Sequence, residues 1–150
     1  MTDRRGTTGV RLPLLPRWVR SLLALGALCG VVYFSIVPPP GSGSVSRRLF
    51  GVVPYDTTLH FVSYAGLAIV FAYASYHSSR PAWQLVVFVF TATVTCGVFI
   101  EGIQYTLATR TSSTRDILVN AFGAGVGVVV WRALDRFVRF YRVRQLELRT

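Results

Sequence analysis

The sequence predicts an all-α, polytopic membrane protein in which four transmembrane helices form a bundle. The first reason is composition: 52% of the 150 residues are hydrophobic and the mean hydropathy is +0.48, which is more apolar than an ordinary soluble domain of this size. The second reason is that the apolar residues fall into four blocks, each close to the ~20 residues that a helix needs to cross a bilayer. We predict a membrane domain over residues 18–134, with helices at about 18–37, 58–76, 82–107 and 116–134.

The first predicted helix, 18–37, follows a basic tail of residues 1–17. Glycine, threonine and proline in this tail argue against a packed element, so we expect it to be mostly disordered. A cleaved signal peptide is the alternative interpretation, because a basic leader precedes an apolar run. We favour a retained helix, since the run is long and the Ser-Ile-Val-Pro-Pro-Pro sequence at its end is a poor cleavage site.

The second predicted helix, 58–76, has polar residues in its capping turn and on one face. Asp56, His60 and Tyr64 are spaced by four residues, so a helix through them places the three side chains on the same side. Burying polar side chains at the end of a membrane-length helix costs free energy. We therefore regard this face as a candidate functional feature.

The third predicted helix, 82–107, begins after Pro81, and proline is well suited to the start of a helix because it lacks the N–H that would be left unpaired there. At 1.5 Å per residue the helix is roughly 39 Å long, which is enough to cross the bilayer and extend past it. Glu101 and Gln104 are three residues apart and share a face near its far end.

On the fourth predicted helix, 116–134, Asp116, Asn120, Gly123 and Gly127 follow one another at steps of four, three and four residues. At 100° per residue they lie in one narrow stripe, which is polar at its start and lined by glycine behind. Asp116 in the first turn suits the positive end of the helix dipole. Gly123 and Gly127 form a GxxxG pair, which predicts close packing against another helix.

All sixteen basic residues are arginine, and their placement predicts the orientation of the bundle. Twelve lie on the side of the two termini and four on the other side, so the positive-inside rule places both termini in the cytoplasm. Trp18, Trp83 and Trp131 fall at the same predicted end, as in an aromatic belt at the inner interface. Residues 135–150 form a basic amphipathic tail, which we expect on an anionic leaflet. The net charge of +10 does not indicate nucleic acid, because the arginines flank apolar blocks and form no patch with base-stacking aromatics.

This orientation brings polar residues from three helices together at the outer side. Three of the six acidic residues lie in that layer, although only four of the sixteen arginines do. Carboxylates and histidine suit general acid–base chemistry, and the planar fork of arginine suits a phosphate or carboxylate ligand. The candidate catalytic residues are Asp56, His60, Glu101 and Asp116, and the candidate ligand-binding residues are Tyr64, Gln104, Arg110, Arg115 and Asn120.

At these residues the sequence resembles the VanZ-like family of small membrane proteins. The matching motifs are Asp56-x3-His60-Phe61-x2-Tyr64 and Glu101-x2-Gln104-x5-Arg110-x2-Ser113-x2-Asp116-x3-Asn120-x2-Gly123-x3-Gly127. The resemblance covers roughly residues 50–134. It implies a four-span helical protein of the cell envelope, located in the plasma membrane, in a family named for a member that raises tolerance to the glycopeptide antibiotic teicoplanin. It does not supply a reaction.

Three functions remain open from the sequence. The first is an enzyme acting on an envelope lipid or a lipid-linked surface precursor, with His60 as general acid or base and Glu101 or Asp116 as its partner. A divalent cation held by Asp56, Glu101 and Asp116 is a variant of this hypothesis, because carboxylate oxygens suit a hard cation. The second is a non-catalytic binder or a conduit for protons or ions, and the third is a purely structural polar network. The chain has no HExxH, GxSxG or phosphate-loop motif, so the sequence names no reaction.

The three hypotheses share one geometric expectation. We predict that His60, Glu101 and Asp116 converge in one cleft on the outer side, linked directly or through one water molecule. The expected partners are the lipid bilayer and an envelope lipid or lipid-linked precursor, without nucleic acid.

Overall fold

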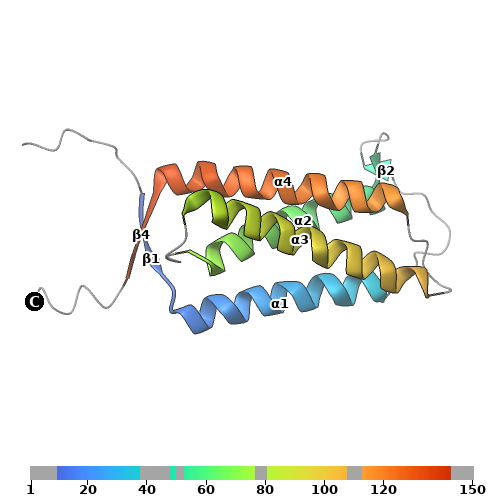
Figure 1. The fold of residues 1–150 in the computed structure, drawn as a ribbon, viewed down its shortest axis with the longest axis horizontal. Helices are drawn as coiled ribbons and strands as arrows, with labels where there is room; N and C mark the ends of the chain where they lie inside the picture. The colour runs from blue at the N-terminus through green and yellow to red at the C-terminus, as the bar shows by residue number, and fades with distance from the viewer. Residues whose placement is uncertain (1–9, 38–47, 50–52, 77–80, 108–112, 143–150) are drawn as a thin grey trace, which may run out of the picture.

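The computed structural model describes residues 10–37, 48–49, 53–76, 81–107 and 113–142. Four long helices make up most of this part of the chain (Figure 1): α1 (Arg17–Ile36), α2 (Tyr55–Ala74), α3 (Ala82–Tyr105) and α4 (Thr114–Phe137). All four are long and apolar enough to cross a membrane. The chain is therefore a four-helix polytopic membrane protein, as the sequence predicts.

The helix ends differ from the predicted ends by three residues or fewer. The differences are largest for α2, which begins at Tyr55 instead of residue 58, and for α4, which ends at Phe137 instead of residue 134. Pro54 precedes α2 with φ −56° and ψ 135°, so the chain turns into the helix directly after the proline. At the other end of α4, Val138 is extended and enters a strand.

Short strands are present in segments that the sequence assigned to tails and loops. β1 (Val10–Leu14) pairs in parallel with β4 (Val138–Arg142), and β2 (Arg48–Leu49) pairs antiparallel with β3 (Val53–Pro54). The expectation that residues 1–17 are mostly disordered is therefore wrong for Val10–Leu14. The alternation of valine, aromatic residues and arginine in β4 suits a strand, and the partner strand supplies its backbone hydrogen bonds.

The bundle has two ends that differ in character (Figure 1). At the tail end, α1 begins, α4 ends and β1 lies beside β4. At the loop end, α2 and α4 begin and α3 ends. In Figure 1, α1 and α4 lie on opposite sides of α2 and α3, and α2 contacts all three other helices.

Helix α4 packs very closely on α2. A Cβ atom on Gly123 would lie 2.5 Å from the carbonyl oxygen of Phe61, and one on Gly127 would collide with the carbonyl of Ala65. Any larger residue would therefore push the two helices apart, which is the physical basis of the GxxxG motif. Below the polar site, small and branched residues fill the core between α2, α3 and α4, including Ala68, Ala124 and Val128.

An aromatic cluster closes the tail end, and it revises the prediction of an aromatic belt. Trp131 is 6% exposed and stacks on Phe140 with ring centroids 6.0 Å apart, so it belongs to the core. Trp18 and Trp83, in contrast, are 67% and 66% exposed and suit a membrane interface. Sequence position alone could not separate these two environments, because the strand pairing that brings Phe140 over Trp131 is not visible in the hydropathy pattern.

Arg20 ties α1 to the end of α2 within the same region. Its side chain is 2% exposed, and Nη1 donates to the carbonyl oxygens of Tyr73 and Tyr76, at 2.9 Å each. These carbonyls belong to the last turn of α2 and the residues after it, where a helix lacks intrahelical donors. A buried arginine of α1 thus caps α2.

Candidate functional site

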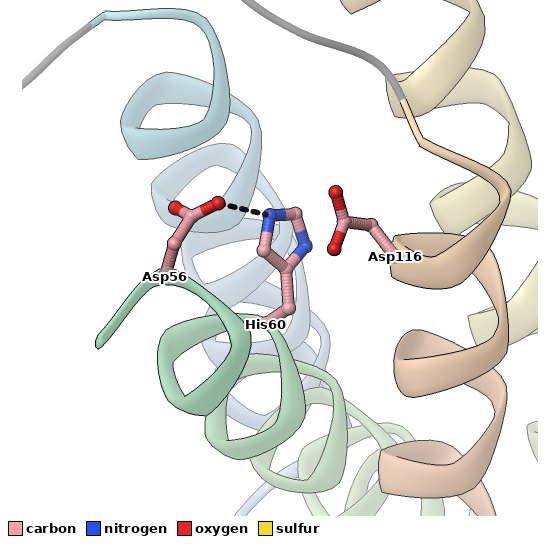
Figure 2. A group of neighbouring side chains, drawn as sticks. All are labelled: Asp56, His60 and Asp116. Atoms are coloured by element: carbon pink, nitrogen blue, oxygen red, sulfur yellow. Dashed lines mark ion pairs between the residues drawn. The ribbon is translucent and has the colours of Figure 1, made fainter. Parts of the chain in front are cut away.

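His60 is the residue on which the polar side chains of the loop end converge. It lies on α2 with its side chain 12% exposed, one turn after Asp56. Figure 2 shows the imidazole ring between the carboxylates of Asp56, on its own helix, and Asp116, on α4. The spacing of four residues that the sequence analysis identified places Asp56 beside the ring, with Oδ2 3.9 Å from His60 Nε2.

Asn120 orients the imidazole ring from the opposite helix. Its Oδ1 lies 3.0 Å from His60 Nδ1, and Asn120 is 1% exposed. Because an amide oxygen can only accept a hydrogen bond, Nδ1 carries the hydrogen in this arrangement. The lone pair of the neutral ring is then on Nε2, which is the nitrogen nearer to Asp56.

Glu101 brings a buried carboxylate to the same ring from α3. The residue is 2% exposed, its Oε1 lies 3.9 Å from His60 Nδ1, and its Oε2 accepts a hydrogen bond of 3.4 Å from the Ser113 backbone N–H. A buried carboxylate is costly unless it is paired or hydrogen-bonded. Glu101 therefore links the end of α3 to the start of α4 as well as to His60.

Asp116 enters the site from the first turn of α4. Ser113 caps this helix, since its Oγ accepts from the Arg115 backbone N–H at 3.1 Å. One ligand atom each from Asp56, His60 and Asp116 lies within 4.8 Å of the other two. This cap fixes the start of α4 and so places the Asp116 carboxylate on the side of the ring shown in Figure 2.

Two buried polar atoms lie next to this group. The Tyr64 hydroxyl and Asn120 Nδ2 have no hydrogen-bond partner within the described ranges, although both residues are only 1% exposed. The Tyr64 ring lies one turn below His60 and is nearly parallel to it, with centroids 6.5 Å apart. Buried polar atoms usually find partners, so these two are candidate contacts for a ligand.

Gly97 makes room for these side chains, and the sequence analysis did not identify it. A Cβ atom there would lie 3.0 Å from Tyr64 Cε1 and 3.3 Å from Asn120 Cβ. The glycine lies four residues before Glu101, on the same face of α3. That spacing was the signal that could have revealed it.

Not every predicted site residue joins the group around His60. Gln104 is 4% exposed and its Nε2 donates to the Ser35 carbonyl at 2.8 Å, so it fastens α3 to the end of α1. Arg115 is exposed at the start of α4. Arg110 lies outside the described residues. The predicted convergence of His60, Glu101 and Asp116 is present in the geometry, because Glu101 Oε1 lies 3.9 Å from His60 Nδ1 and Asp116 lies beside the same ring.

The sequence analysis suggested that Asp56, Glu101 and Asp116 hold a divalent cation, and the structure groups the acids differently. The structure places Asp56 and Asp116 together with His60, and Glu101 lies at the Nδ1 side of the ring with one oxygen held by Ser113. Spacing along each helix predicted which residues share a face, but it could not predict which acids the packing of α4 on α2 brings within 4.8 Å of one another.

Comparison with protein families assigns the chain to one family. The family model VanZ/LLP1 matches residues 27–135. This range includes the second half of α1, all of α2 and α3, nearly all of α4 and every residue of the site. The chain belongs to the VanZ/LLP1 family. Comparison of this VanZ-like chain with curated proteins and with solved structures gave no match.

Proposed function

We propose that this VanZ-like protein binds the anionic head group of a cell-envelope lipid or lipid-linked precursor, at the outer leaflet of the plasma membrane. The observation that carries the proposal is the convergence of polar side chains from three membrane-spanning helices on His60. A polar network of this kind is expensive at the end of an apolar bundle, and intramembrane ionisable groups commonly mark a binding site or a pathway.

The outward orientation of the site is part of the proposal. It is supported by the distribution of arginine, twelve on the side of the termini and four on the side of the loop end. Exposed Trp18 and Trp83 at the tail end suit the inner interface. With this orientation the site lies at the depth where head groups of the outer leaflet begin.

The rim of the site supplies charge for an anionic ligand. Arg115 is exposed next to Asp116, and a guanidinium can hold a phosphate or carboxylate through two parallel hydrogen bonds. The Tyr64 hydroxyl and Asn120 Nδ2 offer two further donors below the ring. An anionic head group would thus meet arginine at the surface and neutral donors deeper in the bundle.

General acid–base catalysis is the second candidate function. The observation that favours it is the fixed position of His60, with Asn120 at Nδ1 and Asp56 nearer to Nε2. A histidine held in one tautomer beside carboxylates is the usual arrangement for proton transfer at neutral pH. Turnover of a lipid-linked substrate, abolished in His60→Gln, would distinguish catalysis from binding.

The test of the proposed function is Glu101→Gln, which keeps the shape and much of the hydrogen bonding but removes the charge. The purified protein is placed in nanodiscs of phosphatidylcholine with or without phosphatidylglycerol, and bound anionic lipid is counted by native mass spectrometry. The loss of a negative charge by itself would favour an anion, but a neutral amide also holds the imidazole and the start of α4 less firmly than the carboxylate does. We expect this loss of order to dominate, so that wild type retains phosphatidylglycerol and Glu101→Gln retains less, with unchanged helix content. Teicoplanin tolerance of a sensitive host expressing each form gives a second measurement.

The opposite result is equally clear. A Glu101→Gln variant with full lipid retention and full tolerance, combined with a Glu101→Leu variant that fails to fold, would show that the network is structural. Arg136→Gln, an exposed charge near the tail end, is the control for nonspecific effects of charge on lipid retention.

A further inference from the structure

We propose that Asp56, His60 and Asp116 bind one divalent transition-metal cation. The inference deepens the proposed function and rests on it for the purpose of the ion, which would join the head group to the protein. The binding of the ion itself is tested with the metal alone. Figure 2 shows the three side chains facing one another from α2 and α4.

The separations of the three groups suit one shared ion. Metal–nitrogen and metal–oxygen bonds of about 2.0–2.2 Å place two ligands of one ion about 3–4 Å apart. His60 Nε2 and Asp56 Oδ2 are 3.9 Å apart, and the three ligand atoms lie within 4.8 Å of one another. The 3.9 Å separation is too long for a direct hydrogen bond, so the pair is spaced for a bridging atom. The side chain of Asp56 is 69% exposed, so it can rotate to bring its carboxylate oxygen within bonding distance of a shared ion.

The orientation of the imidazole gives independent support. A histidine that binds a metal usually donates its other N–H to a carbonyl or carboxylate oxygen, which fixes the tautomer and the ring. Asn120 Oδ1 has this position at 3.0 Å from Nδ1, and Glu101 Oε1 lies 3.9 Å from the same nitrogen. In the neutral ring, Nε2 then carries the lone pair that a metal needs, on the side of Asp56. Asn120 is 1% exposed, so this support is itself held rigidly by the core.

The donor set indicates the class of metal. One imidazole nitrogen with two carboxylate oxygens suits zinc, manganese or cobalt better than calcium or magnesium, which prefer oxygen ligands alone. Two carboxylates and a neutral imidazole carry two negative charges, which a divalent ion would neutralise. Three protein ligands leave coordination positions open, and exposed Asp56 puts that open side toward the membrane surface.

The experiment uses cobalt(II), whose visible spectrum reports both binding and geometry. The full-length protein in detergent is stripped with a chelator and titrated with cobalt(II), followed by competition with zinc(II) and manganese(II). We expect one cobalt ion per wild-type chain. His60→Gln and Asp116→Asn should lose it, and Asn120→Ala should bind about 10–100-fold more weakly because the ring is no longer held.

Matched controls exist in the same chain. His77→Gln changes the other histidine of the sequence, and Asp135→Asn changes an acid near the tail end that is 3.9 Å from Arg132. Both should bind cobalt like wild type. Asp56→Asn alters an exposed side chain and cannot prevent folding by leaving a cavity, so it should weaken binding at least tenfold even if a buried variant misfolds.

The outcomes separate the two proposals. Wild type without a bound ion, or folded variants at Asp56, His60 and Asp116 that all bind cobalt like wild type, would overturn the metal site. Cobalt binding that depends on these residues, in a protein whose lipid retention does not differ between wild type and Glu101→Gln, would leave the metal site standing and remove the lipid proposal. Lipid retention that depends on Glu101 but survives without any metal would leave the lipid proposal standing and overturn the role of the ion in joining the head group to the protein.

Discussion

Gly123 of α4 lies directly against the backbone carbonyl of Phe61 in α2, where a Cβ atom would come within 2.5 Å of the oxygen. Phe61 follows His60 in the chain, and Asn120 lies three residues before Gly123 on the same stripe of α4. The close approach of the two backbones therefore also sets the 3.0 Å contact between His60 and Asn120. The geometry of the polar site therefore depends on the GxxxG packing of α4 on α2.

This relationship predicts that Gly123→Ala perturbs the site from outside it. The added methyl group has to displace the backbone of α2, and overpacking of this kind typically costs about 1–3 kcal/mol. We expect a lower free energy of unfolding in detergent and weaker cobalt binding, although no ligand side chain has changed. Gly127→Ala should behave in the same way, because its Cβ would meet the carbonyl of Ala65.

The matched control is Gly125→Ala on the same helix. A Cβ atom there would lie 3.8 Å from Phe90 Cε2, which is ordinary van der Waals contact. Stability and cobalt binding should stay near wild type, since alanine also has the better helix propensity. Equal losses in Gly123→Ala and Gly125→Ala would show that helix contact does not set the site.

The orientation of the bundle predicts a labelling pattern. In a background with Cys29 and Cys96 replaced by alanine, cysteines at Ser44 and Thr111 should react with an impermeant reagent added to intact cells. A cysteine at Ser79 should react only after the membrane is opened. All three positions lie outside the described residues. Labelling of Ser79 alone in intact cells would invert the orientation and place the site at the inner leaflet.

The sequence was sufficient to predict where the helices lie along the chain, but not how each helix is rotated toward its neighbours. Membrane-length apolar blocks and proline positions are local properties, so the four helices could be predicted to within a few residues. The place of each polar residue also depends on how the helices pack. Gln104 shares a face with Glu101 and yet bonds to Ser35 of α1, because α3 presents this face to two different neighbours.

Tertiary contacts also explain the predictions that failed. Trp131 was expected at a lipid interface, but the pairing of β1 with β4 brings Phe140 over it and buries the indole ring. The strand pairing joins residues at opposite ends of the chain, and hydropathy carries no information about such a contact. The difference in the cation set has the same origin, since the approach of α4 to α2 brings a ligand atom of Asp116 within 4.8 Å of those of Asp56 and His60.

Tyr64 offers a test that separates a ligand contact from a core residue. Its hydroxyl is buried without a hydrogen-bond partner within the described ranges, and an unsatisfied buried polar group costs about 1–3 kcal/mol. Tyr64→Phe removes this cost and keeps the ring beside His60, so we expect equal or higher stability in thermal unfolding. If the hydroxyl contacts the head group, retention of phosphatidylglycerol should fall at the same time.

Tyr73→Phe is the control for this substitution. The Tyr73 hydroxyl accepts a 3.3 Å hydrogen bond from the Leu15 backbone N–H at the tail end, so its removal should lower stability slightly and leave lipid retention unchanged. A less stable Tyr64→Phe variant would mean that the hydroxyl has a structural partner. Unchanged lipid retention in a more stable variant would make Tyr64 a core residue and confine the ligand to the layer of His60 and the groups above it. The combination of gained stability and lost retention is the result expected of a binding site, because it shows a polar group kept at the expense of the fold.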